Sequence, residues 1–453
     1  MHYDTLIKQG KVYLPHGALT VDIGIIGEKI VALGANLEET ADVIIDAKGN
    51  DVFPGGVDAH VHTATELGGF ITNDNFLEST RAAAFGGTTT IVDFAIPEQS
   101  SGHQLPAYLS DRIHSAQQQA TIDFAFHSGL TRIDDDIDEI INACLQLGST
   151  SFKMFTVYPG SVMVTYGEMR RAFEAIARHG GTAVIHAEHQ DLISSAIARE
   201  PKQNPASHRD SRDPLSEVAS VSTVLALLKE TGCPAYFVHI STQAAIAEIS
   251  RYRAQGVYVG AETCPHYLTL DSSLYDGPDG VCYICSPPLR PSSEREALWK
   301  ALAHNEIDLV SSDHCCYTRA QKFQRADNFT AVPNGLPGVE TRMAVLYSYG
   351  VDMGLITPYQ FQQLTSTLPS RWTGLYPQKG AIRIGSDADL VVWERTPKQH
   401  ESSHMATDFL PFRGHRMAGG PRLVLSRGRL IVDGEEFLAK AGQGRYLARK
   451  PQF

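Results

Sequence analysis

Short apolar runs alternate with helix-like segments through the middle of this chain. The eight runs lie at 51–60, 88–95, 122–130, 149–157, 181–189, 235–241, 256–264 and 308–314. The intervening stretches, such as 168–181 and 216–232, have helical spacing and end in glycine, as helix C-termini prefer. Strands that are apolar throughout and separated by helices are typical of a parallel sheet covered on both faces.

Eight strand–helix units over roughly 250 residues favour closure into a (β/α)8 TIM barrel. A doubly wound open sheet is the alternative, but no GxGxxG sequence opens a helix after the first apolar run. Eight units also fit a closed barrel better than an open sheet. The fold class predicted is therefore α/β, with a barrel as the main domain.

The two ends of the chain have a different pattern. Residues 3–35 and 387–432 contain short alternating runs with glycine or aspartate at the turns, which indicates strands. Either end alone is too thin to bury a core, so we expect both to pair into one small β-sandwich. The domain organisation predicted is a first sandwich part at 1–52, a barrel at 53–380, and a second sandwich part with a C-terminal tail at 381–453.

Composition excludes several classes of function. The chain has 453 residues, 43% of them hydrophobic, and a formal net charge of −12, which argues against binding nucleic acid. No apolar run approaches the roughly 20 residues that span a bilayer, and the start lacks a secretory signal pattern. We therefore expect a cytoplasmic protein with no membrane partner. Seven cysteines do not suggest a disulfide scaffold, and buried reduced thiols are expected.

Metal-binding side chains gather where the apolar runs end, the edge at which barrel enzymes place their active sites. These residues are His60, His62, His186, His239 and Asp313, with Lys153 inside the fourth run. His60 and His62 are two positions apart on a strand, so both imidazoles face the same side. Imidazole together with carboxylate suits zinc and similar divalent ions.

Lys153 is unusual because phenylalanines flank it on a strand expected to be central. A buried lysine normally pairs with a carboxylate, and such an ion pair is one interpretation. An ammonium group has no lone pair for a metal. If burial depresses its pKa, however, the neutral amine can react with carbon dioxide to give a carbamate that could bridge two metals. The residues alone leave both interpretations open.

Together these motifs resemble the amidohydrolase superfamily. The residues that carry the resemblance are His60-Val-His62, Lys153, His186-Ala-Glu188, His239-Ile-Ser241, Glu262-Thr-Cys-Pro-His266, Ser286-Pro-Pro-Leu-Arg290 and Asp313-His314-Cys315. Three further segments, at 68–76, 81–89 and 333–340, look specifically like its hydantoinase and dihydropyrimidinase branch. The resemblance runs from about residue 3 to the end of the chain.

The resemblance implies a site for two divalent metal ions, most simply zinc. His60, His62 and Asp313 would hold one ion, and His186 and His239 the other. N-carboxylated Lys153 would bridge them. The family also implies a homotetramer, assembled partly through the C-terminal segment.

The same resemblance assigns the substrate contacts. Tyr158 matches the tyrosine of the family that contacts the substrate, and Ser286 and Asn334 match positions whose backbones hold the ring amide. A hydroxide bridging the metals would attack the carbonyl of a small cyclic ureide or imide, with Asp313 as proton shuttle. Tyr158 would stabilise the oxyanion. The product of a cyclic ureide is an N-carbamoyl amino acid.

Several positions depart from the family pattern without touching a proposed ligand. They are Thr63–Glu66 after His62, His189-Gln190 where the family often has Asn-Gly, and Cys316 in place of a frequent proline. We expect these departures to affect which substrate the protein prefers and not which residues bind metal. His127, His266 and His314 also follow strands, and we expect them to orient ligands rather than bind metal.

Three related functions are alternatives. Dihydroorotase-like sites typically have an arginine just after the HxH motif, and Thr63–Glu66 offers none, although Arg290 could reach the pocket. Allantoinase shares the metal set, but residues 333–338 favour the hydantoinase branch. The dihydropyrimidinase-related scaffold proteins keep the fold and lose metal ligands, whereas all six ligand positions are filled here.

Overall fold

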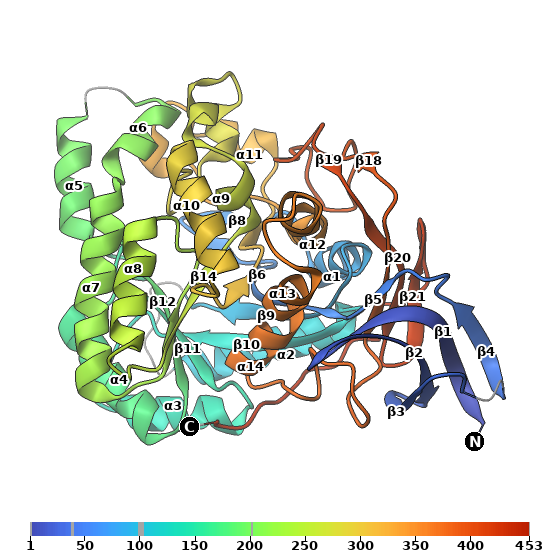
Figure 1. Ribbon diagram of the computed structural model, residues 1–453. Helices are drawn as coiled ribbons and strands as arrows, with labels where there is room; N and C mark the ends of the chain where they lie inside the picture. Colours follow the sequence, from blue (N-terminus) through green and yellow to red (C-terminus); the bar gives the residue numbers. More distant parts are fainter. Residues whose placement is uncertain (1, 38–39, 98–103, 201–202, 453) are drawn as a thin grey trace.

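The computed structural model describes residues 2–37, 40–97, 104–200 and 203–452. Over these residues the chain forms two nine-stranded sheets and two small two-stranded ones. One large sheet is the barrel, and the other is built from both ends of the chain (Figure 1). The two lie side by side, with the terminal sheet at the flank of the barrel.

The barrel strands follow the apolar runs in order. They are β6 (Gly56–His62), β9 (Thr88–Ala95), β10 (Asp123–Gly129), β11 (Ser151–Phe155), β12 (Thr182–His186), β13 (Ala235–Phe237), β14 (Val259–Thr263), β15 (Leu309–Val310) and β16 (His314–Cys315). All neighbours pair in parallel. The eighth run is split: β15 pairs with β14 and β16 with β6, so this one segment closes the sheet. The predicted fold class is confirmed.

Helices surround the barrel strands (Figure 1). The longer ones are α1 (Phe76–Phe85), α2 (Leu105–Gln119), α3 (Ile137–Gln146), α4 (Tyr166–Arg178), α5 (Gln190–Arg199), α7 (Pro214–Thr231), α8 (Gln243–Arg253) and α10 (Ser292–Ala303). Shorter ones are α6 (Pro205–Ser211), α9 (Pro265–Thr269), α11 (Arg319–Phe323), α12 (Arg342–Leu346), α13 (Pro358–Gln362) and α14 (Leu368–Trp372). Local sequence fixes their ends: Asn75 and Glu78 form a capping box at α1, and Gly232 ends α7 with a φ of 68°.

The terminal sheet joins the two ends of the chain, as predicted. Its strands are β1 (Tyr3–Leu14), β2 (Gly17–Ile26), β3 (Lys29–Gly34), β4 (Ala41–Asp46), β5 (Asp51–Pro54), β17 (Leu390–Glu394), β20 (Gly420–Ser426), β21 (Arg429–Asp433) and β22 (Glu436–Phe437). The junction is antiparallel, with Val52 opposite Val392. Ile25 and Ile30 share one buried cluster with Val392 and Leu425, so the sheet encloses its own core. Strand β5 runs across the boundary predicted between residues 52 and 53.

The segment after β22 leaves this sheet and returns to the barrel. Phe124 donates its amide hydrogen to Arg445 (3.0 Å), and Leu447 donates to Phe124 (2.8 Å). The buried Arg449 guanidinium donates to Ser151 Oγ at 2.9 Å and also to the Phe126 carbonyl. Since these contacts lie near the beginnings of β10 and β11, the tail packs at the end of the barrel opposite to the strand ends that carry the candidate ligands.

The seven cysteines are free and buried, which confirms the expectation of unpaired thiols. Two short strand pairs complete the architecture, β7 (Glu66–Leu67) with β8 (Phe70–Ile71) and β18 (Lys398–Gln399) with β19 (Arg416–Met417). Among the described helices, none has the length and apolar character needed to cross a membrane.

Candidate metal centre and active site

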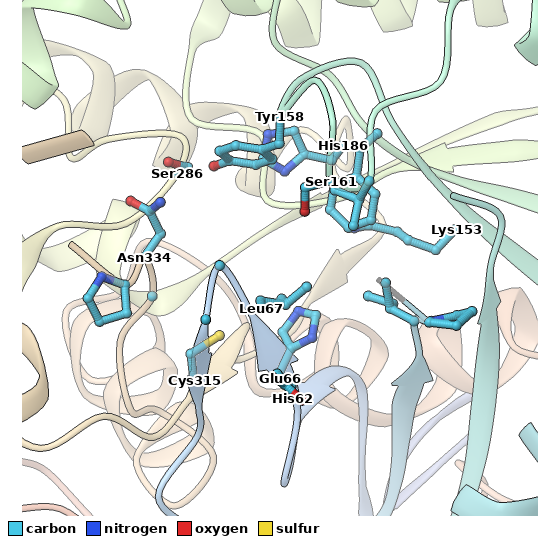
Figure 2. Close-up of a pocket in the computed structure, with 18 of the residues that line it drawn as sticks. His62, Glu66, Leu67, Lys153, Tyr158, Ser161, His186, Ser286, Cys315 and Asn334 are labelled. Atoms are coloured by element: carbon cyan, nitrogen blue, oxygen red, sulfur yellow. The ribbon is translucent and has the colours of Figure 1, made fainter. Parts of the chain in front are cut away.

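A cleft of about 1380 Å³ opens at the carboxyl ends of the barrel strands. Its lining includes every candidate ligand and every candidate substrate contact: His60, His62, Lys153, His186, His239, Asp313, Tyr158, Ser286 and Asn334. These residues come from distant parts of the sequence and meet only because the strands run in parallel. Figure 2 shows several of them pointing into the cleft from opposite walls.

One group of metal-binding atoms is tightly clustered. One ligand atom from each of His60, His62 and Asp313 lies within 4.8 Å of the others, and all three residues are buried. His60 Nε2 and His62 Nε2 are 3.1 Å apart, and Asp313 Oδ1 lies 3.0 Å from the first and 3.5 Å from the second. The two-residue spacing on β6 therefore directs both imidazoles toward the same carboxylate.

His186 and His239 form a second pair beside this trio. Their ring centroids are 4.5 Å apart, and the centroid of His239 is 5.5 Å from that of His60. Lys153 Nζ lies 5.0 Å from the ring centroid of Phe94 and 5.0 Å from that of Phe155. The Lys153 side chain is buried, and within the described residues it has no carboxylate at ion-pair distance. The ion-pair interpretation of this lysine thus lacks a partner there.

Two buried carboxylates fix the orientation of the imidazoles. Glu262 Oε1 lies 2.8 Å from His60 Nδ1, and Glu188 Oε2 lies 2.8 Å from His186 Nε2. In each ring a carboxylate holds one nitrogen, the arrangement that positions histidine ligands of metals. Nδ1 of His62 and of His239 is buried without a hydrogen-bond partner among the described residues. The donor set therefore fits divalent metal ions.

Burial dominates the electrostatics of this group. It lowers the pKa of His62 to about 4 and holds that of His239 well below its usual range, so both rings keep a lone pair. Burial also lowers the pKa of Lys153 to about 8, against the attraction of Asp313 and Glu262. For Asp313, burial raises the pKa, but the charge of His60 and hydrogen bonds from both histidines of β6 outweigh it and give a pKa well below the usual range.

The candidate substrate contacts lie on one wall of the cleft. The Tyr158 hydroxyl points toward Ser286, with Asn334 beside it (Figure 2). Ser286 Oγ and Asn334 Oδ1 are buried and lack hydrogen-bond partners among residues that the structure describes. The Tyr158 amide donates to Gln190 Oε1 (3.1 Å), one of the positions that depart from the family pattern. Unpaired polar atoms lining a cleft are suited to contact a polar ligand.

Three of these residues have unusual backbone conformations. The φ angles of Tyr158, His239 and Asp313 are 72°, 40° and 47°, a region that side chains other than glycine adopt at a cost. Such strain persists only where the surroundings enforce it, and it collects at functional sites. Its occurrence at three residues facing one cleft supports a functional reading of all three.

Sequence reasoning missed the network behind His186. Arg212 Nη1 donates to Glu188 Oε2 (2.5 Å), and the Arg212 guanidinium carbon lies 5.2 Å from the ring centroid of Tyr158. This one side chain thus connects a proposed metal ligand with a proposed substrate contact. Burial opposes the charge of Arg212, but attraction to Glu188 outweighs it and raises the pKa of the guanidinium. The only feature of the sequence that could have indicated this network is the arginine after α6.

Other strand-end residues lie behind the site. His127 Nε2 faces the Ala59 carbonyl at 3.0 Å, and His314 lies 2.9 Å from Asp74 Oδ2 while accepting from the Gly338 amide at 3.0 Å. Arg290 donates to Ser241 Oγ (2.9 Å) and is not part of the cleft lining. The arginine that sequence analysis regarded as able to reach the pocket therefore points elsewhere.

The chain belongs to the amidohydrolase family, whose model matches residues 52–415. A D-hydantoinase of Streptomyces coelicolor is 38% identical over 461 residues, covering 98% of each chain. A D-hydantoinase of Geobacillus stearothermophilus is 37% identical over 454 residues, covering 98% of this chain and 96% of the relative. The crystal structure of a dihydropyrimidinase from Brevibacillus agri matches with a TM-score of 0.96 and 35% identity over 99% of each chain. The resemblance seen in the motifs is confirmed.

Proposed function

We propose that this protein hydrolyses the cyclic amide bond of hydantoins and dihydropyrimidines to give N-carbamoyl amino acids. The observation that carries the proposal is the convergence of four histidines, one aspartate and one lysine in a single cleft, together with Tyr158, Ser286 and Asn334. The relatives named D-hydantoinase and dihydropyrimidinase support the same reaction class.

Two divalent ions, most simply zinc, would be held by the six candidate ligands, with His60, His62 and Asp313 on one side and His186 and His239 on the other. Lys153, N-carboxylated, would complete both sets, because a carboxylate-like anion suits a position shared by two cations. When bound, such a metal pair lowers the pKa of water toward neutrality and polarises a carbonyl oxygen. The carboxylates of Glu262 and Glu188 would keep the imidazoles aligned.

The side chains of this protein would then direct the reaction. Backbone groups of Ser286 and Asn334 hold the ring amide, and the Tyr158 hydroxyl donates a hydrogen bond to the carbonyl oxygen as negative charge develops on it. Asp313 accepts the proton of the attacking water and delivers it to the ring nitrogen as the C–N bond breaks. One C–O bond forms, one C–N bond breaks, and the proton ends on the released nitrogen.

The lining of the cleft favours neutral rings. It contains Glu66 and Asp111 but no arginine among the described residues. A ring carboxylate moved out of water needs a cationic partner, because burying it unpaired is very costly. Dihydroorotate is therefore a poor candidate substrate, and allantoin stays the second candidate because its ring is neutral.

A substrate panel with metal analysis on the same preparation tests the proposal. We expect about two divalent ions per chain, and a kcat/KM for a 5-substituted hydantoin or dihydrouracil that exceeds the value for dihydroorotate at least about a hundredfold. Metal-free protein with chelator-insensitive activity would contradict the metal site. Dihydroorotate as the best substrate would overturn the assignment, and allantoin as the best would move it to the sister activity.

Tyr158→Phe tests the oxyanion contact. We expect kcat to fall about 10²–10³-fold, the usual cost of losing one such donor, with metal content unchanged. The measurement is steady-state kinetics with elemental analysis on the same sample. Tyr166→Phe is a matched control, because Tyr166 Oη donates to Ser220 Oγ (3.3 Å) outside the cleft lining. A Tyr158→Phe protein with the parental kcat would assign the tyrosine to packing alone.

We also propose a cytoplasmic location and a homotetrameric assembly. Both rest on the family resemblance and on the sequence pattern of the chain. Light scattering coupled to gel filtration measures the assembly directly, and a mass corresponding to one or two chains would contradict the tetramer.

A further inference from the structure

A buried lysine connects the two loops that bear Ser286 and Asn334. Lys322, on α11, is 1% exposed. Its Nζ donates to the carbonyl oxygens of Ile284 (2.7 Å), Pro333 (2.7 Å) and Gly335 (2.8 Å). These carbonyls lie two residues before Ser286 and directly on either side of Asn334.

The chemistry of the group matches this position. An ammonium has three hydrogens to donate and no acceptor, and three carbonyl oxygens receive all of them. Within the described part of the chain no carboxylate lies at ion-pair distance from Lys322, so the peptide oxygens stabilise the charge together with the Tyr317 ring, whose centroid is 5.6 Å from Nζ. A charge that is expensive to bury is thus held by the backbone of two loops, rather than by a counter-ion.

A backbone hydrogen bond joins the two loops directly, and each loop also has its own anchor: His208 Nε2 lies 2.8 Å from the Cys285 carbonyl, and the Cys315 amide donates to the Leu336 carbonyl (2.9 Å). The Gly335 amide donates to the Ile284 carbonyl (3.0 Å), which is the same oxygen that receives a hydrogen from Lys322. Helix α11 is itself anchored: a capping box of Thr318 and Gln321 begins it, and Gln321 Nε2 donates to the Ile71 carbonyl (2.8 Å). Because α11 is anchored, the Lys322 ammonium group has a fixed position from which its hydrogen bonds can hold both loops.

We propose that Lys322 is a positioning residue for substrate binding: it sets the distance between the Ser286 and Asn334 backbones, so that both can contact one ring amide at once. This inference rests on the proposed function. Lys322 does not line the cleft and would touch neither the substrate nor the metals. It acts through the loops, and its loss would change binding more than chemistry.

Lys322→Met tests the proposal, since methionine retains most of the apolar stem and removes all three donors. We expect KM for a 5-substituted hydantoin to rise about 10- to 100-fold, the loss expected for charge-assisted hydrogen bonds. Contacts made equally in the ground state and the transition state affect KM alone, so kcat should change less than about threefold. Metal content should equal that of the parent. Lys322→Gln, which keeps an amide donor, should give an intermediate KM.

Lys300→Met, on the exposed surface of α10, is the matched control and should leave KM unchanged. A folded, metal-loaded Lys322→Met protein with the parental KM would refute the proposal, as would a fall in kcat at constant KM or a loss of metal. Failure of both Lys322 variants to fold would assign the residue to stability and refute it as well. A parent protein that opens none of the rings would instead refute the proposed function, on which this role depends.

Discussion

Asp313→Asn should reduce turnover by at least about 10³–10⁴-fold, at the upper end of what one proton-transfer group contributes. The amide cannot accept a proton from water, and it would be a weaker ligand for the metal ion that Asp313 is proposed to hold. In the structure this oxygen lies 3.0 Å from His60 Nε2. Steady-state kcat on the best ring substrate measures the loss.

The control for Asp313→Asn is Asp135→Asn, which makes the same chemical change at an exposed position whose ion pair is with Arg171. It should retain parental kcat, because exposed ion pairs contribute little. If Asp313→Asn keeps more than about a tenth of the parental kcat with metal bound, then another residue carries the proton and the proposed role is wrong.

Lys153→Ala should lose bound metal and activity together. The side chain is 1% exposed and ends among aromatic rings, so alanine leaves a cavity where the proposed bridging anion would lie. We expect metal content to fall well below one ion per chain and kcat/KM to fall at least about 10³-fold, since the proposed metals would supply the nucleophile. Elemental analysis and kinetics on one preparation measure both.

Rescue separates a missing bridge from general damage in Lys153→Ala. Formate, acetate or propionate added with zinc should partly restore activity, because a small carboxylate can occupy the vacated space. Lys229→Ala, at an exposed position of α7, should behave as the parent does. An unmodified Lys153 in a crystal structure of the active, metal-loaded protein would show that carboxylation is not required.

The strands and the candidate ligands could be predicted because both follow from short-range patterns. Each of the eight apolar runs contains a barrel strand, and the candidate ligands other than Lys153, which lies within β11, are near strand ends that parallel pairing brings together. The partners of those ligands could not be predicted. Glu262 meets His60 across 202 positions, which depends on barrel closure. Arg212 meets Glu188 across 24 positions, which depends on how α5 and α6 fold back after β12, so neither contact follows from local spacing.

The contacts of the C-terminal tail could not be predicted from the sequence either. Its pattern after β22 is irregular and polar, and nothing in it predicts that Arg449 would insert beneath β10 and β11. Lys322 likewise has no sequence signal beyond a lysine in a short helix. Its role depends on where three backbone carbonyls converge, and carbonyl positions are set by loop geometry that periodicity does not encode.

The antiparallel pairing of Val52 with Val392 also determines when, during synthesis, the terminal sheet can be completed. At about 5–20 residues per second, the ribosome reaches β17 roughly 17–70 seconds after it has made β5. During that interval the inner edge of the terminal sheet has no partner strand, and an unpaired edge is a template for association with other chains. Because of the order of translation, β5 can therefore pair with β17 only after the whole barrel has been synthesised.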